Sequence, residues 1–166
     1  MRNLANTKIK QQGINRVMTT ITLPSVATQC AIVNVDSKKQ VLEKIALLAS
    51  EMDTSLNYKD VMDALQRRER LGSTAMGHGV AIPHTRIQSL KNPLCIVLRL
   101  SNPTNFSENE VMPVNIVFAL LVPEEADETH LQLLAQISRR CGDKKFREHF
   151  LAANDNQDLF HLVNHE

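Results

Sequence analysis

Aromatic side chains are scarce in this sequence: they make up 4% of its 166 residues, and tryptophan is absent. A surface that binds single-stranded nucleic acid by stacking bases on aromatic rings is therefore not expected. The chain also lacks an excess of charge of one sign, because 19 basic residues face 18 acidic ones and the formal net charge is +1. Without a strongly basic balance, we expect no nucleic-acid partner and no attraction to acidic membranes.

Long apolar runs and paired cysteines are missing too. The longest apolar run, residues 114–122, includes Asn115 and has about half the length that a helix needs to span a bilayer. The start of the chain has no apolar core of the kind that marks a signal peptide. The three cysteines, Cys30, Cys95 and Cys141, are odd in number and far apart. They are expected to be unpaired thiols in a reducing compartment, so we expect a cytoplasmic protein without membrane insertion.

The remaining composition is that of a globular domain, with 43% hydrophobic and 22% charged residues. A chain of this length is sufficient for one domain with a substantial core. Residues 1–19 carry four basic side chains, no acidic one and no hydrophobic period. We expect a flexible basic tail there, followed by a single folded domain in residues 20–166.

Hydrophobic spacing predicts strands that alternate with helices. The strands are predicted at residues 30–35, 80–82, 94–100 and 114–122. The helices are predicted at residues 37–52, 57–71, 128–141, 144–152 and 157–165. Ser37 with Gln40, and Asn57, supply N-cap signals for the first two helices. This alternation indicates an α/β domain with a mixed, mostly parallel central sheet flanked by helices.

Residues 68–84 differ from this regular pattern. They contain three glycines, two small hydroxyl residues, two histidines and a proline. Pro83 fixes its own φ and favours an extended conformation for Ile82. His84 therefore follows a stiff dipeptide at the end of a short strand, and its ring should have little freedom to move.

Three side chains would meet if the predicted elements form an open α/β sheet, because ligands of such sheets bind at the carboxyl ends of strands. His84 follows one strand, His130 lies in the first turn of the helix after another, and Arg68 ends the helix before the glycine-rich segment. A neutral imidazole can attack phosphorus, and a guanidinium can bind two phosphate oxygens. The combination is typical of a site for a phosphoryl group.

Other residues of the segment extend this hypothesis. The hydroxyls of Ser73 and Thr74 and the backbone amides near Gly77 and Gly79 are candidate donors to a bound phosphate. Each candidate also has a plainer interpretation. The glycines suit tight turns, Arg68 can cover the edge of the core, and the histidines can be structural.

A metal site is a further alternative. His78, His84 and His130 could bind zinc in a metal-dependent hydrolase, but no carboxylate or cysteine stands near them in a recognised ligand pattern. The glycine motifs of nucleotide-binding loops are absent. We therefore expect no metal and no cofactor. From the residues alone, the inference ends at a histidine-centred anion site.

Arg-Glu-x-Leu-Gly-Ser-Thr at residues 68–74, followed by Gly-x-Gly-Val-Ala-Ile-Pro-His at residues 77–84, resembles a known signature. It is similar to that of the enzyme IIA components of the bacterial phosphotransferase system, in the mannitol/fructose and nitrogen-regulatory superfamily. His-Leu-x-x-Leu at residues 130–134 is a second match. The resemblance extends from about residue 20 to residue 165 and implies a mixed sheet flanked by helices.

By this resemblance, His84 is the phosphorylated histidine, and His130 and Arg68 bind its phosphoryl group. The family implies a phosphohistidine intermediate in phosphoryl transfer between proteins, with an HPr-like carrier as the donor. Arg-Leu-Gly-Ser-Thr and Arg86 favour the nitrogen-regulatory branch. Members of that branch act as signals and bind partners such as potassium-transport regulators according to their phosphorylation state.

Two other functions stay open at this point. One is a sugar-specific enzyme IIA, for fructose or mannitol, that passes the phosphoryl group to a transporter domain. The other is a regulatory binding module whose histidine is not phosphorylated. Three positions depart from the family pattern: Ala75, His78 and Thr85 stand where Gly, Asn and Gly are frequent.

Overall fold

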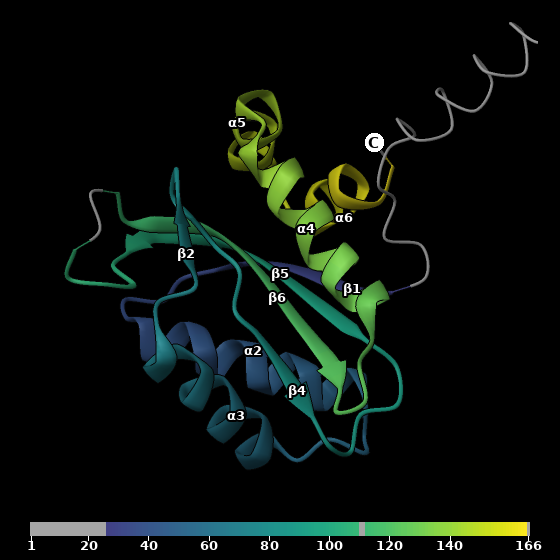
Figure 1. Ribbon diagram of the computed structural model, residues 1–166. Coiled ribbons are helices and arrows are strands. Elements are labelled where there is room, and N and C mark those ends of the chain that lie inside the picture. Colours follow the sequence, from purple (N-terminus) through teal and green to yellow (C-terminus); the bar gives the residue numbers. More distant parts are fainter. Residues whose placement is uncertain (1–25, 110–111, 166) are drawn as a thin grey trace, which may run out of the picture.

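One mixed β-sheet lies between two layers of helices in the computed structural model, which describes residues 26–109 and 112–165 (Figure 1). The strands are β1 (Ala27–Val33), β2 (Ala75–Gly77), β3 (Val80–Ala81), β4 (His84–Ile87), β5 (Leu94–Thr104) and β6 (Val114–Pro123). The helices are α2 (Lys38–Met52), α3 (Tyr58–Leu71), α4 (Glu128–Gly142), α5 (Lys144–Ala152) and α6 (Asn156–His165). The predicted basic tail, residues 1–19, and the predicted start of the domain at residue 20 lie outside the described residues.

The predicted α/β class and the mixed, mostly parallel sheet are confirmed. The strand order is β1-β5-β6-β3-β2, and β4 also pairs with β6. Within the described part of the chain, three strand pairs are parallel (β1–β5, β3–β6 and β4–β6) and two are antiparallel (β5–β6 and β2–β3). β3 and β4 therefore lie one after the other along the same side of β6, and only Ile82 and Pro83 separate them.

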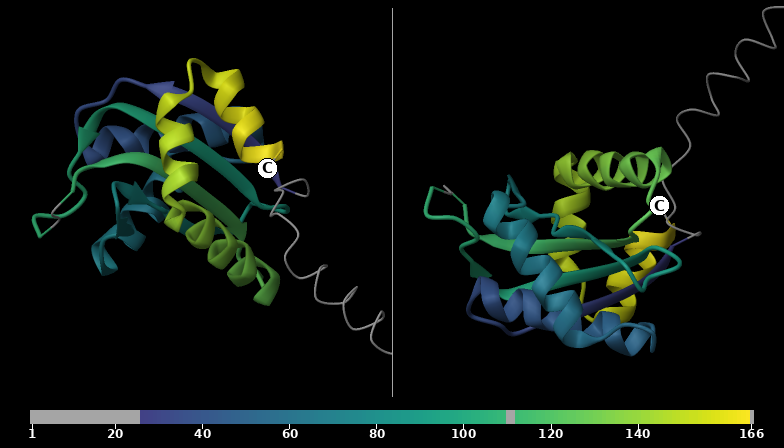
Figure 2. Two further views of the ribbon diagram at one scale, coloured as in Figure 1. Left: turned by 90° about the horizontal axis from the view of Figure 1, so that it is seen from above. Right: turned by 60° about the horizontal axis from the view of Figure 1, so that its bottom comes forward.

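The two faces of the sheet bury two separate hydrophobic clusters, as the alternation of side chains along a strand requires. On β6, Val117, Ala119 and Leu121 pack in the cluster that contains the apolar residues of α2 and α3. Ile116, Phe118 and Leu120 pack in the cluster that contains those of α4, α5 and α6. Figure 2 shows the same arrangement from two further sides, with α2 and α3 on one face and α4, α5 and α6 on the other.

Helix caps and cysteines behave as the sequence indicates. The Ser37 hydroxyl accepts a hydrogen bond from the Gln40 backbone N–H at 3.2 Å, and Asn57 caps α3 in the same way through Lys59. Cys30, Cys95 and Cys141 are buried and free; burial raises the pKa of each thiol.

None of the described helices is long and apolar enough to cross a membrane.

Four strand details differ from the predictions. β1 lies at Ala27–Val33 rather than at residues 30–35, because these residues pair in parallel with Leu94–Leu100 of β5. β5 continues to Thr104, beyond the predicted end at residue 100, because Thr104 still pairs with Val114 of β6. β2 and β4 form where no strand was predicted. No residue of β2 is buried, and Ile87 is the one buried residue of β4, so neither strand has a hydrophobic pattern. Their pairing partners, which are distant in sequence, determine them instead.

A tight turn joins β2 to β3. Its residues Gly77, His78 and Gly79 all have positive φ, at 88°, 56° and 75°. The Gly79 carbonyl accepts hydrogen bonds from the backbone N–H groups of Asn115 and Ile116 at 2.9 and 3.0 Å. A Cβ atom on Gly79 would lie 2.9 Å from the Asn115 Oδ1 atom. Gly79 is therefore required both by its backbone conformation and by its close approach to β6.

We expect Gly79→Ala to lower the free energy of unfolding by about 1–3 kcal/mol, because alanine is strained at positive φ and its Cβ collides with Asn115. Gly142→Ala is the matched control: a Cβ at Gly142 meets no atom within 4 Å, and a stabilisation of about 0.5–1 kcal/mol is expected there. Urea unfolding of both variants measures the difference. Equal unfolding free energies for the two variants would contradict this account of the turn.

Candidate functional site

His84 lies at the interruption between β3 and β4, on an edge of the sheet. The Pro83 carbonyl accepts a hydrogen bond from the Leu120 backbone N–H at 2.9 Å, so the chain stays paired with β6 across the interruption. The His84 side chain turns back on this segment, and its Nδ1 atom lies 2.7 Å from the Ile82 carbonyl oxygen. A carbonyl oxygen can only accept a hydrogen bond, so Nδ1 carries the ring proton. In the neutral ring, Nε2 is therefore unprotonated and has a lone pair.

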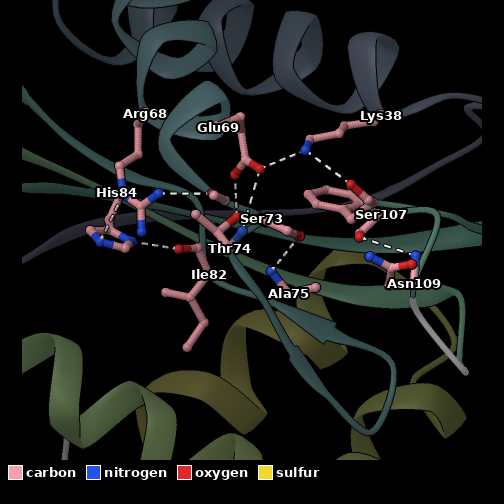
Figure 3. Close-up of polar contacts among 12 residues, drawn as sticks. Lys38, Arg68, Glu69, Ser73, Thr74, Ala75, Ile82, His84, Ser107 and Asn109 are labelled. Atoms are coloured by element: carbon pink, nitrogen blue, oxygen red, sulfur yellow. Dashed lines mark hydrogen bonds and ion pairs between the residues drawn. The ribbon is translucent and has the colours of Figure 1, made fainter.

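Arg68 reaches the same ring from α3, on one face of the sheet (Figure 3). Its Nε–H donates to the His84 Nε2 atom at 3.4 Å, and its Nη1 donates to the Gly72 carbonyl oxygen at 2.9 Å. The second contact holds the guanidinium at the end of α3. A positive charge with several N–H donors therefore lies beside the nitrogen that carries the lone pair.

His130 approaches from the opposite face, in the first turn of α4. Its Nδ1 atom lies 3.2 Å from the Asp127 backbone N and 3.3 Å from the Asp127 Oδ1 atom. The two contacts suit different protonation states. A neutral ring accepts the Asp127 N–H at Nδ1 and carries its proton on Nε2, whereas a protonated ring donates to the carboxylate. When Nδ1 accepts the Asp127 N–H, the Nε2–H of His130 is a donor.

His84 and His130 line one cavity of about 90 Å³, together with the apolar side chains of Leu120, Ala126 and Leu134. The structure thus brings together the three residues that the sequence singled out, because α3, the strand edge and α4 each supply one. Leu131, which also lines this cavity, is 64% exposed. Leu131 is therefore an accessible apolar side chain beside this cavity.

Ser73 and Thr74 make other contacts. The Ser73 hydroxyl accepts a hydrogen bond from the Ala75 backbone N–H at 3.2 Å. The Thr74 hydroxyl, on a residue that is buried, donates to the Glu69 carboxylate. Through these contacts, both side chains stabilise the conformation of the segment between α3 and β2. Their role as phosphate ligands stays a prediction.

Gly77 and Gly79 lie in the turn between β2 and β3, away from His84. Val80, next to Gly79, lies opposite Ile116 of β6, whereas His84 lies opposite Leu120. Four residues of strand correspond to about 13 Å. A role for these glycines in phosphate binding is therefore also a prediction, and their observed role is the turn. In the described part of the chain, no group of three or more His, Cys, Asp or Glu residues could hold a metal ion.

Sequence reasoning missed three residues of the site. Ile82 supplies a carbonyl, which no side-chain pattern reveals. Asp127 stands three residues before His130 at the start of a helix, and this spacing is a usable signal. Glu69 lies within the Arg-Glu-x-Leu-Gly-Ser-Thr motif, but its residue type gave no indication of its partners.

Comparison with known proteins identifies the family of this chain. The family described as phosphoenolpyruvate-dependent sugar phosphotransferase system, EIIA 2, matches residues 27–166. A nitrogen regulatory protein of Bradyrhizobium diazoefficiens is 39% identical over 129 residues, which are 78% of this chain and 84% of that protein.

Solved structures show the same fold. The nitrogen regulatory protein IIA-Ntr from Neisseria meningitidis superposes with a TM-score of 0.75 at 33% identity, over 84% of this chain and 94% of that one. The mannitol enzyme IIA from Escherichia coli, solved in complex with phosphorylated enzyme IIB, superposes with a TM-score of 0.65 at 12% identity. That alignment covers 87% of this chain and 96% of that one. The chain therefore belongs to the EIIA 2 family of the phosphoenolpyruvate-dependent sugar phosphotransferase system, and within it to the nitrogen-regulatory type.

Proposed function

We propose that this protein accepts a phosphoryl group on Nε2 of His84 from an HPr-like phosphohistidine carrier, and that its phosphorylation state controls the binding of regulated partners. The observation that carries the proposal is the contact between His84 Nδ1 and the Ile82 carbonyl oxygen. It holds the proton on Nδ1 and leaves the Nε2 lone pair directed away from the backbone. An imidazole in this tautomer is a competent nucleophile.

The reaction is an in-line displacement at phosphorus. The Nε2 lone pair of His84 gives up its hydrogen bond from the Arg68 Nε–H and forms the new N–P bond. The N–P bond to the carrier breaks at the same time, and that electron pair returns to the carrier's ring. No proton needs to leave His84, because Nδ1–H remains bonded to the Ile82 carbonyl. The ring gains positive charge as the N–P bond forms, and the carbonyl dipole stabilises that charge. The bond is therefore easily broken again, as reversible transfer requires.

Arg68 and His130 supply the counter-charge for the phosphoryl oxygens from opposite sides of the sheet. Arg68 already contacts the attacking nitrogen, so a phosphoryl group attached there lies within reach of its guanidinium. His130 shares a cavity with His84, and its Nε2–H can donate to a second oxygen. Positioning and electrostatic stabilisation are the main sources of catalysis in phosphoryl transfer, so this set needs no metal ion.

Proteins of this family act with phosphocarriers and enzyme IIB domains. For this chain we propose an HPr-like carrier that docks over Leu131, beside the cavity, and over Leu71 at the end of α3, which is 85% exposed. Docking there removes water from the reacting groups. A phosphoryl group then adds about two negative charges beside this surface, enough to change the affinity of a partner such as a potassium-transport regulator.

Three buried, free thiols are consistent with a reducing cytoplasm as the place of action.

A sugar-specific role, with transfer to a transporter's enzyme IIB domain, is the second candidate, and the complex of the mannitol relative motivates it. The nitrogen-regulatory relatives, at 39% and 33% identity, support the first role instead. Incubation of the phosphorylated protein with a fructose- or mannitol-type enzyme IIB domain separates the two. We expect no rapid loss of the phosphoryl group to that domain.

The proposal is tested by incubating the protein with phosphoenolpyruvate, enzyme I and the HPr-like carrier of the same genome, followed by intact-mass measurement. We expect the addition of one phosphoryl group that is lost in acid, as a phosphohistidine is, and no addition when the carrier is omitted. An unchanged mass in the complete mixture would leave only a regulatory module that is not phosphorylated.

A further inference from the structure

We infer that Glu69 and Thr74 are positioning residues that fix the orientation and tautomer of the His84 ring, through a chain of hydrogen bonds that starts at a buried carboxylate. This inference rests on the proposed function for its kinetic consequence, but its structural part concerns the unphosphorylated protein. It assigns a positioning role to Thr74, which the sequence suggested as a phosphate ligand, and the same role to Glu69.

The series of hydrogen bonds begins at the carboxylate of Glu69, whose side chain is only 5% exposed. Lys38 of α2 forms an ion pair with it at 2.6 Å. The Thr74 hydroxyl donates to one carboxylate oxygen, and the Thr74 backbone N–H donates to the other at 3.3 Å. The Lys38 ammonium also donates to the Phe106 carbonyl at 3.0 Å. A buried carboxylate with these three donors is held in one position, and Thr74 is held with it.

Two hydrogen bonds through Ile82 connect Thr74 with the His84 ring, which is shown with its neighbours in Figure 3. The Thr74 carbonyl accepts a hydrogen bond from the Ile82 backbone N–H at 3.0 Å, directly beyond the pairing of Ala75 with Ala81. The Ile82 carbonyl in turn accepts the Nδ1–H of His84 at 2.7 Å. Pro83 intervenes and has no N–H of its own. Thr74 is therefore the residue that anchors Ile82 on its amide side.

Loss of the Thr74 hydroxyl should loosen this anchor. The Ile82 carbonyl would then hold Nδ1–H less firmly, and the ring would exchange to the tautomer with its proton on Nε2. In that tautomer Nε2 has no free lone pair, so His84 cannot attack phosphorus. The expected result is a slower transfer whose cause is visible in the free protein.

The experiment compares Thr74→Val with Thr74→Ser and wild type. The ¹⁵N chemical shifts of the His84 ring report its tautomer in the unphosphorylated protein, and single-turnover transfer from the phosphorylated carrier reports the rate. We expect Thr74→Val to raise the share of the Nε2–H tautomer and to slow transfer about three- to tenfold, the effect of one hydrogen bond. Thr74→Ser, which keeps the hydroxyl, should restore both. Thr104→Val is the matched control, because Thr104 is also buried and its hydroxyl donates to the Asn102 carbonyl at 3.1 Å.

Identical ring shifts and transfer rates in Thr74→Val and Thr104→Val would overturn the inference, since a merely structural role for Thr74 predicts that result. If Thr74→Val does not fold, Glu69→Gln provides the same two readouts. It keeps the side-chain volume but replaces one accepting oxygen with an NH₂ donor, and unchanged shifts there overturn the inference equally. Failure of wild type to be phosphorylated would contradict the proposed function, whereas the ring shifts would still test the positioning chain.

Discussion

Replacing His84 with alanine is expected to abolish phosphate uptake from the phosphorylated carrier, with no mass addition above background. The reason is that Nε2 of His84 is unprotonated and lies beside a guanidinium, at 3.4 Å from Arg68 Nε. We do not expect His130 to substitute for it, because the Asp127 backbone N–H donates to its Nδ1 atom at 3.2 Å, and this bond places the ring proton on Nε2. Loss of a covalent nucleophile removes the reaction route itself.

The fold should survive this change. His84 is half-buried, and the segment around it remains paired through the Pro83 carbonyl and the Leu120 N–H. Loss of the bond to Ile82 should cost about 1 kcal/mol of unfolding free energy. His149→Ala is the matched control, because His149 is exposed on α5, and it should take up one phosphoryl group as wild type does. A His84→Ala protein that is still phosphorylated would refute the assignment.

Replacing Arg68 with alanine is expected to slow phosphoryl transfer about a thousandfold, the lower range for an arginine that stabilises a transferring phosphoryl group. The guanidinium is held in place by its bond to the Gly72 carbonyl at 2.9 Å, so its charge requires no rearrangement when the phosphoryl group arrives. Arg68→Lys should recover only part of the rate, since a lysine keeps the charge but loses the planar fork.

Single-turnover measurements at several carrier concentrations provide the test, because a role in transition-state stabilisation lowers the maximal rate rather than the affinity for the carrier. Arg67→Ala is the matched control. Arg67 is the preceding residue of α3, but it lines a separate groove with Asp60 and Asp63, and its replacement should leave the rate unchanged. Equal effects of Arg68→Ala and Arg67→Ala would show that the surface charge of α3, not the contact with His84, is what matters.

Local signals in the sequence were sufficient for the elements whose hydrophobic period is long. The helices at 38–52 and 58–71 were predicted nearly to their ends, because a cap residue and several buried positions specify each of them. β2 and β4 were not predicted, because they carry few or no buried side chains and depend on partner strands instead. The same distinction holds within the site. His84, His130 and Arg68 were found by residue type and motif, whereas Ile82 acts through its backbone.

By itself, the sequence determined the fold class, the family resemblance and the three side chains proposed for the chemistry, since each of these depends on residue types at short spacing. The tertiary structure alone decided that Arg68 contacts His84 and that His130 lines a cavity with it from the opposite face of the sheet. It also decided that the Thr74 hydroxyl binds Glu69, and which ring nitrogen of His84 carries the proton. The physical reason is that hydrogen-bond partners are chosen by proximity in space, and residues 16 positions apart, such as Arg68 and His84, meet only after the sheet has formed.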